Sequence, residues 1–321
     1  MADSADLYRT VRLIRRFEQR AIEMVRSGVI AGGIHPYIGE EAIAAGVCAA
    51  LRADDLITST HRGHGHVLAK GADPIRLLAE LAGRQTGLNR GRGGSMHAAD
   101  FSAGIYGANA IVGASAAIAA GAAWSHRRAG HDRVAVTFFG DGAVNQGVLL
   151  EALNMTSLRR LPVIFVCENN QFATSMRARD STAGTITGRA EAFGIPAETI
   201  DGMDPETVLA AASGAVARAR AGAGPAFLEC LTYRFDVHHT WEYVARPRYR
   251  TDEEVAAGSV RDPLEIQGAR VPAAVRARID DEIDELLDQA RRFVDASPEP
   301  DPSAALDYLY AGGLRGRAGT A

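Results

Sequence analysis

Two short polar motifs in the middle of the 321-residue sequence combine residue types that can bind a metal ion and phosphate. They are Gly140-Asp141-Gly142 and Asn169-Asn170, and each closely follows an apolar run of strand length. Such runs are typical of buried parallel strands, and ligands bind outside the carboxyl ends of these strands. Positions 141 and 170 are 29 residues apart, which leaves room for one helix and a returning strand. We therefore expect both motifs at one edge of a sheet, on neighbouring strands.

Oxygen atoms at this edge could bind Mg²⁺, a hard cation that takes six oxygen ligands. The carboxylate of Asp141, the amide oxygen of Asn170 and the backbone carbonyl of Phe172 would supply three ligands, and water and phosphate oxygens would supply the rest. Glycines on both sides of Asp141 let the backbone approach a diphosphate. A helix that begins near Ala143 would point its N–H groups at the same phosphate. Each motif alone is a common turn, but the two together at this spacing favour a metal–diphosphate site.

The elements that must position these motifs alternate along the chain. Alternating strand and helix patterns favour one α/β domain over residues 1–321, with a mainly parallel central sheet and helices on both faces. Helical extensions are expected at both ends, and the C-terminal one covers about residues 262–310. Apolar periodicity predicts helices over 4–27, 40–51, 74–82 and 145–158, and strands over 54–59, 134–139, 162–167 and 227–232.

Three polar segments interrupt these patterns and are expected to be loops, over residues 87–94, 174–187 and 236–252. The last is long for a compact domain, and long loops are usually functional or disordered. Residues 312–321 resemble a frayed tail.

Composition excludes several classes of function. The net charge of −4 and a pI near 6.2 give no support for a nucleic-acid partner. The three cysteines are far apart and are expected to be buried thiols in a reducing compartment. No apolar leader opens the chain, so we expect a cytoplasmic location. The uncharged stretch 101–125 is rich in glycine and alanine, which predicts a tightly packed core helix instead of a membrane span.

The motif pair resembles the thiamine diphosphate motif, and the likeness extends well beyond it. The string over residues 140–147 is similar to the alpha subunits of pyruvate, branched-chain 2-oxo-acid and acetoin dehydrogenases, the E1 components. Further similar strings lie at 92–97, 107–113, 167–170 and 201–204, in the family's order. The resemblance covers roughly residues 8–270, and it implies thiamine diphosphate and Mg²⁺ as cofactors.

The resemblance also implies roles for residues that sequence alone would not select. His61 and Arg62 match a segment that meets the cofactor diphosphate, and the His-Arg-Gly-His-Gly string is closer to acetoin dehydrogenases. The backbone at Ala110 and Val112 would hydrogen-bond the aminopyrimidine, and Ile111 would buttress the bent cofactor. From composition alone these three apolar residues would be interpreted as core.

Two segments depart from the family pattern, and both concern the substrate. His238 aligns best with a family histidine that helps proton or acyl transfer, and His239 is its immediate rival. His35 matches a histidine near the substrate, although it could equally be a turn residue. Gly33 stands where pyruvate-using relatives have Phe, which predicts a larger substrate pocket. The serines of the regulated enzymes are missing, so a regulatory phosphorylation loop is not expected.

The implied chemistry needs a second chain. A small 2-oxo acid or ketone would lose CO₂ or undergo C–C cleavage to a thiazolium-stabilised enamine, and the acyl unit would pass to a lipoyl-type acceptor on an E2 or carrier protein. The family's catalytic glutamate comes from a separate beta subunit, so an α₂β₂ heterotetramer is expected.

Two alternatives remain open at this stage. One is a transketolase-like enzyme that transfers a ketol unit without oxidising it. The other is a non-catalytic phosphate- or nucleotide-binding α/β module. A Rossmann dehydrogenase has no support, because no GxGxxG motif opens a strand–helix unit.

Overall fold

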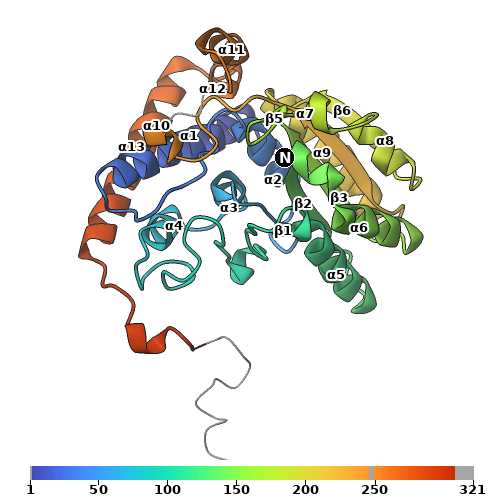
Figure 1. Ribbon diagram of the computed structural model, residues 1–321, viewed down its shortest axis with the longest axis horizontal. Helices are drawn as coiled ribbons and strands as arrows, with labels where there is room; N and C mark the ends of the chain where they lie inside the picture. The colour runs from blue at the N-terminus through green and yellow to red at the C-terminus, as the bar shows by residue number, and fades with distance from the viewer. Residues whose placement is uncertain (1, 246–248, 308–321) are drawn as a thin grey trace, which may run out of the picture.

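The central element of the computed structural model, which describes residues 2–245 and 249–307, is a five-stranded sheet (Figure 1). All four pairings in the sheet are parallel, as the sequence predicted. In spatial order the strands are β1 (Leu56–Thr58), β2 (Ala135–Gly140), β3 (Val163–Asn169), β7 (Ala226–Leu231) and β6 (Ala197–Asp201). A separate two-stranded hairpin pairs β4 (Phe172–Ala173) with β5 (Met176–Arg177).

The register of the sheet brings the two polar motifs together. Gly140 at the end of β2 pairs with Glu168 near the end of β3. Asp141 and Asn170 therefore leave neighbouring strands at the same edge, which confirms the expected juxtaposition. The carboxyl end of β7 reaches the same edge, because Asn169 pairs with Leu231.

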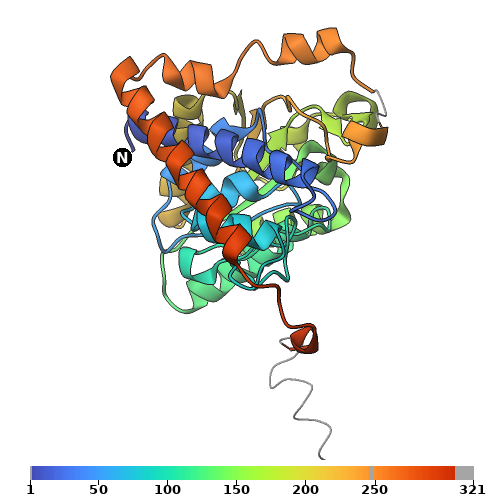
Figure 2. The ribbon, with the colours of Figure 1, turned by 90° about the vertical axis from the view of Figure 1, so that its left-hand side faces the viewer.

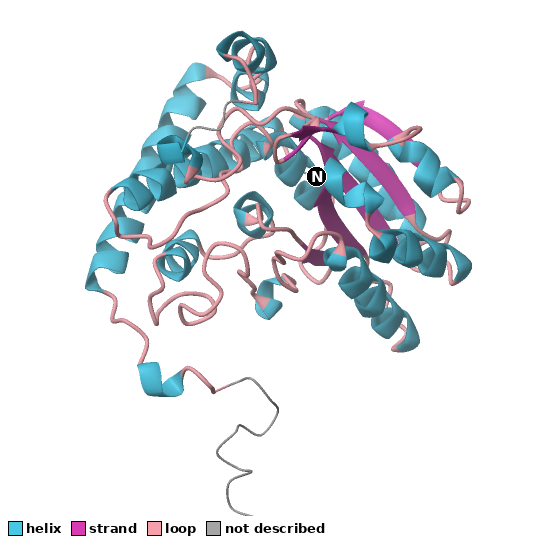
Figure 3. Cartoon of the chain, in the orientation of Figure 1, coloured by secondary structure: helices cyan, strands magenta, loops and turns pink. Residues whose placement is uncertain are grey.

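Helices cover both faces of the sheet (Figure 3). Alternate strand residues pack against each layer. Val136 and Phe138 of β2 belong to one core cluster, whereas Ala135 and Phe139 belong to the other. The first layer contains α2 (Glu41–Ala49), α3 (His64–Ala69) and α9 (Pro205–Arg220), and the second contains α5 (Ala114–Arg128), α6 (Gly147–Leu158) and α8 (Ile186–Glu191). Helix α4 (Pro74–Leu81) packs instead against α13 (Ala273–Ala296).

The N-terminal helix α1 (Ser4–Arg26) and the C-terminal helix α13 (Ala273–Ala296) pack against each other, and Figure 2 shows them crossing. Their apolar residues join the first core cluster. Ion pairs such as Arg16–Asp284 and Arg20–Asp288, both 2.7 Å, line the contact. The expected helical C-terminal segment thus includes α13, preceded by α11 (Asp252–Gly258) and α12 (Pro263–Gly268) and followed by the short turn η3 (Pro302–Ala304).

Several local expectations were wrong. The stretch 101–125 is not one helix, because Gly104, Gly107 and Gly113 have positive φ values of 75°, 113° and 83° that interrupt it between η1 (Phe101–Ala103) and α5. The helix expected over 145–158 is α6, and a 3-10 turn, η2 (Asp141–Asn145), precedes it. Two of the three expected loops contain short helices: α7 (Ala178–Ser181) lies in 174–187, and α10 (Glu242–Ala245) lies in 236–252.

The frayed tail expected over residues 312–321 falls outside the described residues. Within them, no helix combines the length and the apolar character that a bilayer crossing requires.

Candidate functional site

A pocket of about 270 Å³ opens at the carboxyl ends of β2 and β3. Most residues that the sequence assigned to the cofactor line it, except Ala110, and the two candidate catalytic residues His35 and His239 do not. The expected residues in the lining are His61, Arg62, Ile111, Val112, Gly140, Asp141, Gly142, Ala143, Asn170, Phe172 and His238.

The carboxylate of Asp141 has the burial and the free oxygen of a metal ligand. Its side chain is buried, and its Oδ2 atom has no hydrogen-bond partner among the described residues. Burial raises the pKa of Asp141 to about 6. A buried oxygen without a partner is costly, and a divalent cation would remove that cost. The position therefore fits the Mg²⁺ that the sequence implied.

The Asn170 amide is fixed so that its oxygen is the group available to a metal. Its Nδ2 donates to Oε1 of Glu40 at 2.6 Å, and its Oδ1 accepts the Phe172 N–H at 3.1 Å. An amide oxygen has two lone pairs, so one remains for a cation. The Phe172 carbonyl as a third ligand stays a prediction.

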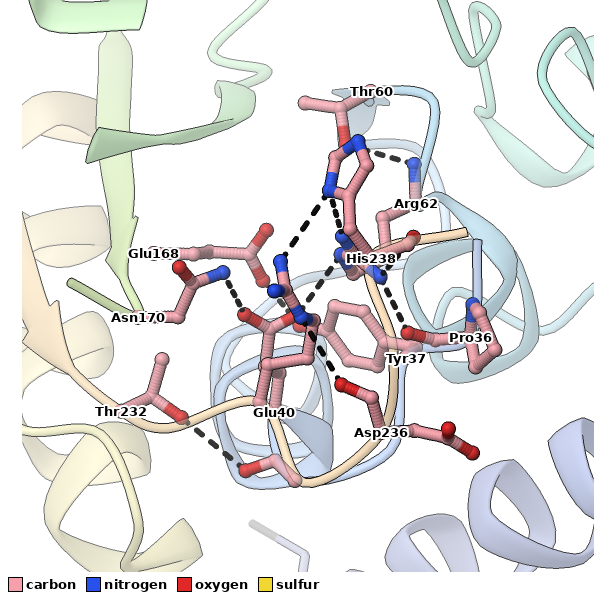
Figure 4. Close-up of polar contacts among 12 residues, drawn as sticks. Pro36, Tyr37, Glu40, Thr60, Arg62, Glu168, Asn170, Thr232, Asp236 and His238 are labelled. Carbon is pink, nitrogen blue, oxygen red and sulfur yellow. Dashed lines mark hydrogen bonds and ion pairs between the residues drawn. The ribbon is translucent and has the colours of Figure 1, made fainter. Parts of the chain in front are cut away.

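Glu40 is a site residue that the sequence interpretation missed. It is buried at the start of α2, and its carboxylate joins Asn170 to Arg62, whose Nε lies 3.3 Å from Oε2 (Figure 4). Arg62 also donates to the carbonyl of Pro36 at 2.6 Å and to Nδ1 of His238 at 3.0 Å. One carboxylate thus links the expected metal end and the expected diphosphate end of the pocket. The feature of the sequence that could have indicated Glu40 is the acidic pair Glu40-Glu41 at the start of an apolar helix.

A buried hydrogen-bond network supports the floor of the pocket. Glu168 lines the pocket and accepts from the Tyr37 hydroxyl, and its Oε1 lies 2.9 Å from Nε2 of His66. Nδ1 of His66 in turn lies 2.7 Å from the hydroxyl of Ser59. These groups satisfy one another, so Glu168 is already engaged.

Ile111 and Val112 form an apolar rim instead of part of the core. Their side chains are 69% and 49% exposed, so the interpretation from composition alone was wrong. Oδ1 of Asn109 accepts the N–H of Ile111 at 2.8 Å and fixes this turn. Exposed apolar side chains at a pocket mouth offer a surface for a flat or bent ligand.

The structure distinguishes the two adjacent histidines. His238 lines the pocket, and its Nδ1 accepts from both Arg62 and Arg234, at 3.0 and 3.3 Å. Guanidinium groups only donate, so the proton of the neutral ring is on Nε2. Burial and the charge of Arg62 lower the pKa of His238 to about 2, and the same causes lower that of His61 to about 3. Both rings are therefore uncharged at neutral pH.

The space beside Gly33 is filled, so the expected enlargement of the pocket is wrong. A Cβ atom at this position would lie 2.4 Å from Cε1 of His239 and 2.8 Å from Oγ1 of Thr240. The loop that carries His239 occupies the volume that a larger side chain would take.

Arginines hold the 236–252 segment against the site. Arg250 donates to the carbonyl of Asp236 at 2.6 Å, and Arg234 donates to the hydroxyl of Tyr249 at 2.6 Å. Arg250 is therefore bound to the backbone beside the site. Residues 246–248 lie outside the described residues.

Comparison with known proteins shows the family of the chain. Residues 8–303 match the family described as Dehydrogenase E1 component. The chain belongs to this family, which implies thiamine diphosphate as its cofactor.

Relatives match over nearly the whole length. The chain is 41% identical to the alpha subunit of acetoin:2,6-dichlorophenolindophenol oxidoreductase from Bacillus subtilis, over 95% of this chain and 92% of the relative. It is 42% identical to the subunit of the same name from Cupriavidus necator, over 95% and 93%. It is 40% identical to the pyruvate dehydrogenase E1 component subunit alpha of Rhizobium meliloti, over 94% and 88%. The prediction of an E1-type alpha subunit is confirmed.

Proposed function

We propose that this chain binds thiamine diphosphate through Mg²⁺ in the pocket at the ends of β2 and β3 and, together with a beta subunit, cleaves a small 2-oxo acid or acetoin. The acyl unit then passes to a lipoyl-type acceptor on an E2 or carrier protein. The observation that carries this proposal is the buried, unpartnered Oδ2 of Asp141 beside Asn170. It provides a reason for a cation at this position that is independent of family resemblance.

Each end of the pocket has a proposed task. Asp141, Asn170 and the Phe172 carbonyl hold Mg²⁺, and Arg62 with His61 binds the diphosphate. Arginine suits this task because its planar fork can bind two phosphate oxygens. The backbone at Ala110 and Val112 would bind the aminopyrimidine, and the exposed side chain of Ile111 supports a buttressing role.

His238 has the best-supported role at the substrate. When bound, thiamine diphosphate supplies the electron sink for cleavage next to a carbonyl. His238 holds its proton at Nε2 because two arginines occupy Nδ1. That proton can be donated in a hydrogen bond to a substrate oxygen. The ring of His35 contacts the rings of His61 and His238, with centroids 4.6 and 5.0 Å away, and would position them.

The beta subunit would supply the catalytic carboxylate, because each carboxylate in the pocket of this chain has another role. Three carboxylates line the pocket within the described residues, those of Glu40, Asp141 and Glu168. Glu40 is bound to Arg62 and Asn170, Glu168 is bound to Tyr37 and His66, and we assign Asp141 to the metal. The carboxylate that must protonate the aminopyrimidine therefore comes from the partner, in an α₂β₂ assembly.

Reconstitution tests this function. The chain would be purified alone and with its beta subunit, and reduction of 2,6-dichlorophenolindophenol measured with acetoin and with pyruvate. We expect reduction only with both subunits, thiamine diphosphate and Mg²⁺. Ketol transfer to a sugar acceptor without dye reduction would instead support the transketolase-like alternative and overturn the proposal.

A further inference from the structure

Gly33 lies where two distant segments of the chain touch so closely that no side chain fits. Besides its contact with Cε1, a Cβ atom there would lie 2.8 Å from Nε2 of His239. Gly33 does not have a positive φ value, so its backbone conformation does not require glycine. Steric contact with the imidazole of His239, and with Oγ1 of Thr240 beside it, is therefore the reason for glycine at this position.

The imidazole of His239 is held at Gly33 by hydrogen bonds from its own loop. The Thr240 N–H donates to the carbonyl of Ile34 at 3.0 Å, and the Ile34 N–H donates to the Thr240 hydroxyl at 3.0 Å. The Trp241 N–H donates to Nδ1 of His239 at 3.1 Å. Nδ1 is therefore an acceptor, and the neutral ring has its proton on Nε2.

His239 supports a group of four imidazoles that ends at the pocket. The ring of His35 lies edge-on to three others, with centroids 4.6 Å from His239, 4.6 Å from His61 and 5.0 Å from His238. One nitrogen from each of His35, His61 and His238 lies within 4.8 Å of the other two. A transition metal could use such a cluster, but Arg62 contacts the His238 ring and disfavours a second cation.

Two nitrogens in this group need a partner. Nδ1 of His35 and Nε2 of His61 are buried and make no hydrogen bond within the described residues. Of these two rings, His61 lines the pocket and His35 does not, so Nε2 of His61 is the atom that we assign to a substrate hydroxyl. A hydroxyl group can donate to or accept from an imidazole nitrogen, whichever tautomer is present, whereas a carboxylate at neutral pH only accepts. A carboxylate also loses more hydration on burial and needs charged donors. The two guanidinium groups that contact His238 have other partners. Arg62 is bound to Glu40 and assigned to the diphosphate, and Arg234 donates to Tyr249.

We propose that Gly33 and His239 act as a pair that sets substrate choice, in which the imidazole fills the space at Gly33 and holds His35 edge-on against His61 and His238. The resulting wall of uncharged hydrogen-bonding rings selects a small ketone with a neighbouring hydroxyl over a 2-oxo acid. This inference rests on the proposed function and names the substrate class of the same site. His239 and His35 act in it as positioning residues, because neither lines the pocket.

A double-mutant cycle tests the pair in the holoenzyme with its beta subunit. Dye reduction would give kcat/KM for acetoin and for pyruvate in the wild type, Gly33→Ala, His239→Ala and the double variant. We expect the wild type to prefer acetoin, and each single variant to lower the acetoin-to-pyruvate ratio about fivefold, the size of one ordinary hydrogen bond. Gly33→Ala should lower the ratio less in the His239→Ala background than in the wild type, because the imidazole is already gone and the contact with Oγ1 of Thr240 remains.

The matched control is Gly214→Ala on α9, where a Cβ meets no atom within 4 Å, and it should leave the ratio unchanged. A wild type that prefers pyruvate, or single effects that simply multiply in the double variant, would overturn the inference. Calorimetry separates the two levels of the account. If the wild type binds thiamine diphosphate but the Gly33 and His239 variants keep its acetoin-to-pyruvate ratio, only the role of the Gly33–His239 pair is rejected. If the wild type does not bind thiamine diphosphate, the proposed function is rejected.

Discussion

The carboxylate of Asp141 lies where a negative charge is costly unless a cation joins it. In the folded chain burial raises its pKa to about 6, from an ordinary value of 3.8. The fold therefore favours the protonated form, so this group's contribution to stability falls as the pH rises from 4 to 6. The difference corresponds to about 3 kcal/mol.

This pH dependence can be measured in the cofactor-free protein. Urea unfolding of the wild type and Asp141→Asn at pH 4 and pH 7 gives the difference in unfolding free energy. The wild type should lose about 3 kcal/mol relative to Asp141→Asn over this range, and Mg²⁺ with thiamine diphosphate should abolish the loss. A difference that is constant with pH would show that the carboxylate is not destabilised by burial.

Arg62 acts through the geometry of its guanidinium group as well as its charge. It binds Glu40, the Pro36 carbonyl and His238 at once, which an ammonium group on a single stem cannot reproduce. Arg62→Lys in the holoenzyme should therefore weaken thiamine diphosphate binding about tenfold in calorimetry, the scale of one lost charged contact. Arg218→Lys, an exposed change on α9, is the control. Unchanged affinity in Arg62→Lys would mean that charge alone is sufficient.

Sequence predicted the residues whose chemistry is local and missed those defined by distant contacts. Asp141 and Asn170 could be found because each directly follows an apolar strand. Glu40 could not, since its partner Asn170 is 130 residues away in sequence. The filled space at Gly33 was likewise invisible, because His239 comes from a segment about 200 residues further on.

At the scale of elements, one buried carboxylate organises the glycine-rich loop. Glu80 at the end of α4 accepts four backbone N–H groups, from Asn89, Gly91, Gly93 and Gly94, at 2.7 to 3.1 Å. In Glu80→Gln, an NH₂ group that can only donate replaces one carboxylate oxygen. About two backbone N–H groups of the loop would therefore lose their acceptor. We expect a loss of about 3–5 kcal/mol in unfolding free energy, measured by urea denaturation.

An exposed glutamate provides the comparison. Glu282 pairs with Arg9 on the surface of α13, and Glu282→Gln should cost less than about 1 kcal/mol. Equal losses in the two variants would show that Glu80 does not hold the loop.

Elements with a buried face could be predicted, whereas exposed or irregular ones could not. The strands β2 and β3 are buried, apart from Gly140 at the end of β2, and contain continuous apolar runs. The edge strand β6 has one fully buried residue, Ile200, and therefore no such run, so it was missed. The irregular stretch before α5 was misinterpreted because composition alone does not reveal positive φ values.

At the scale of the whole molecule, the fold brings one half of an active site to the carboxyl edge of its sheet. The residues that we assign to the metal, the diphosphate and the substrate meet there. Each carboxylate in the pocket already has a partner or a proposed metal. The account therefore depends on Asp141 as the anchor of the cofactor in an enzyme assembled from two kinds of chain.

Calorimetry on the assembled, EDTA-treated holoenzyme tests this anchor most directly. Thiamine diphosphate would be titrated into the wild type and Asp141→Ala, with and without Mg²⁺. The account predicts tight binding to the wild type only with Mg²⁺, and a loss of at least a hundredfold in affinity in Asp141→Ala, about 2.7 kcal/mol or more. Mg²⁺-dependent binding of full affinity in Asp141→Ala would contradict it.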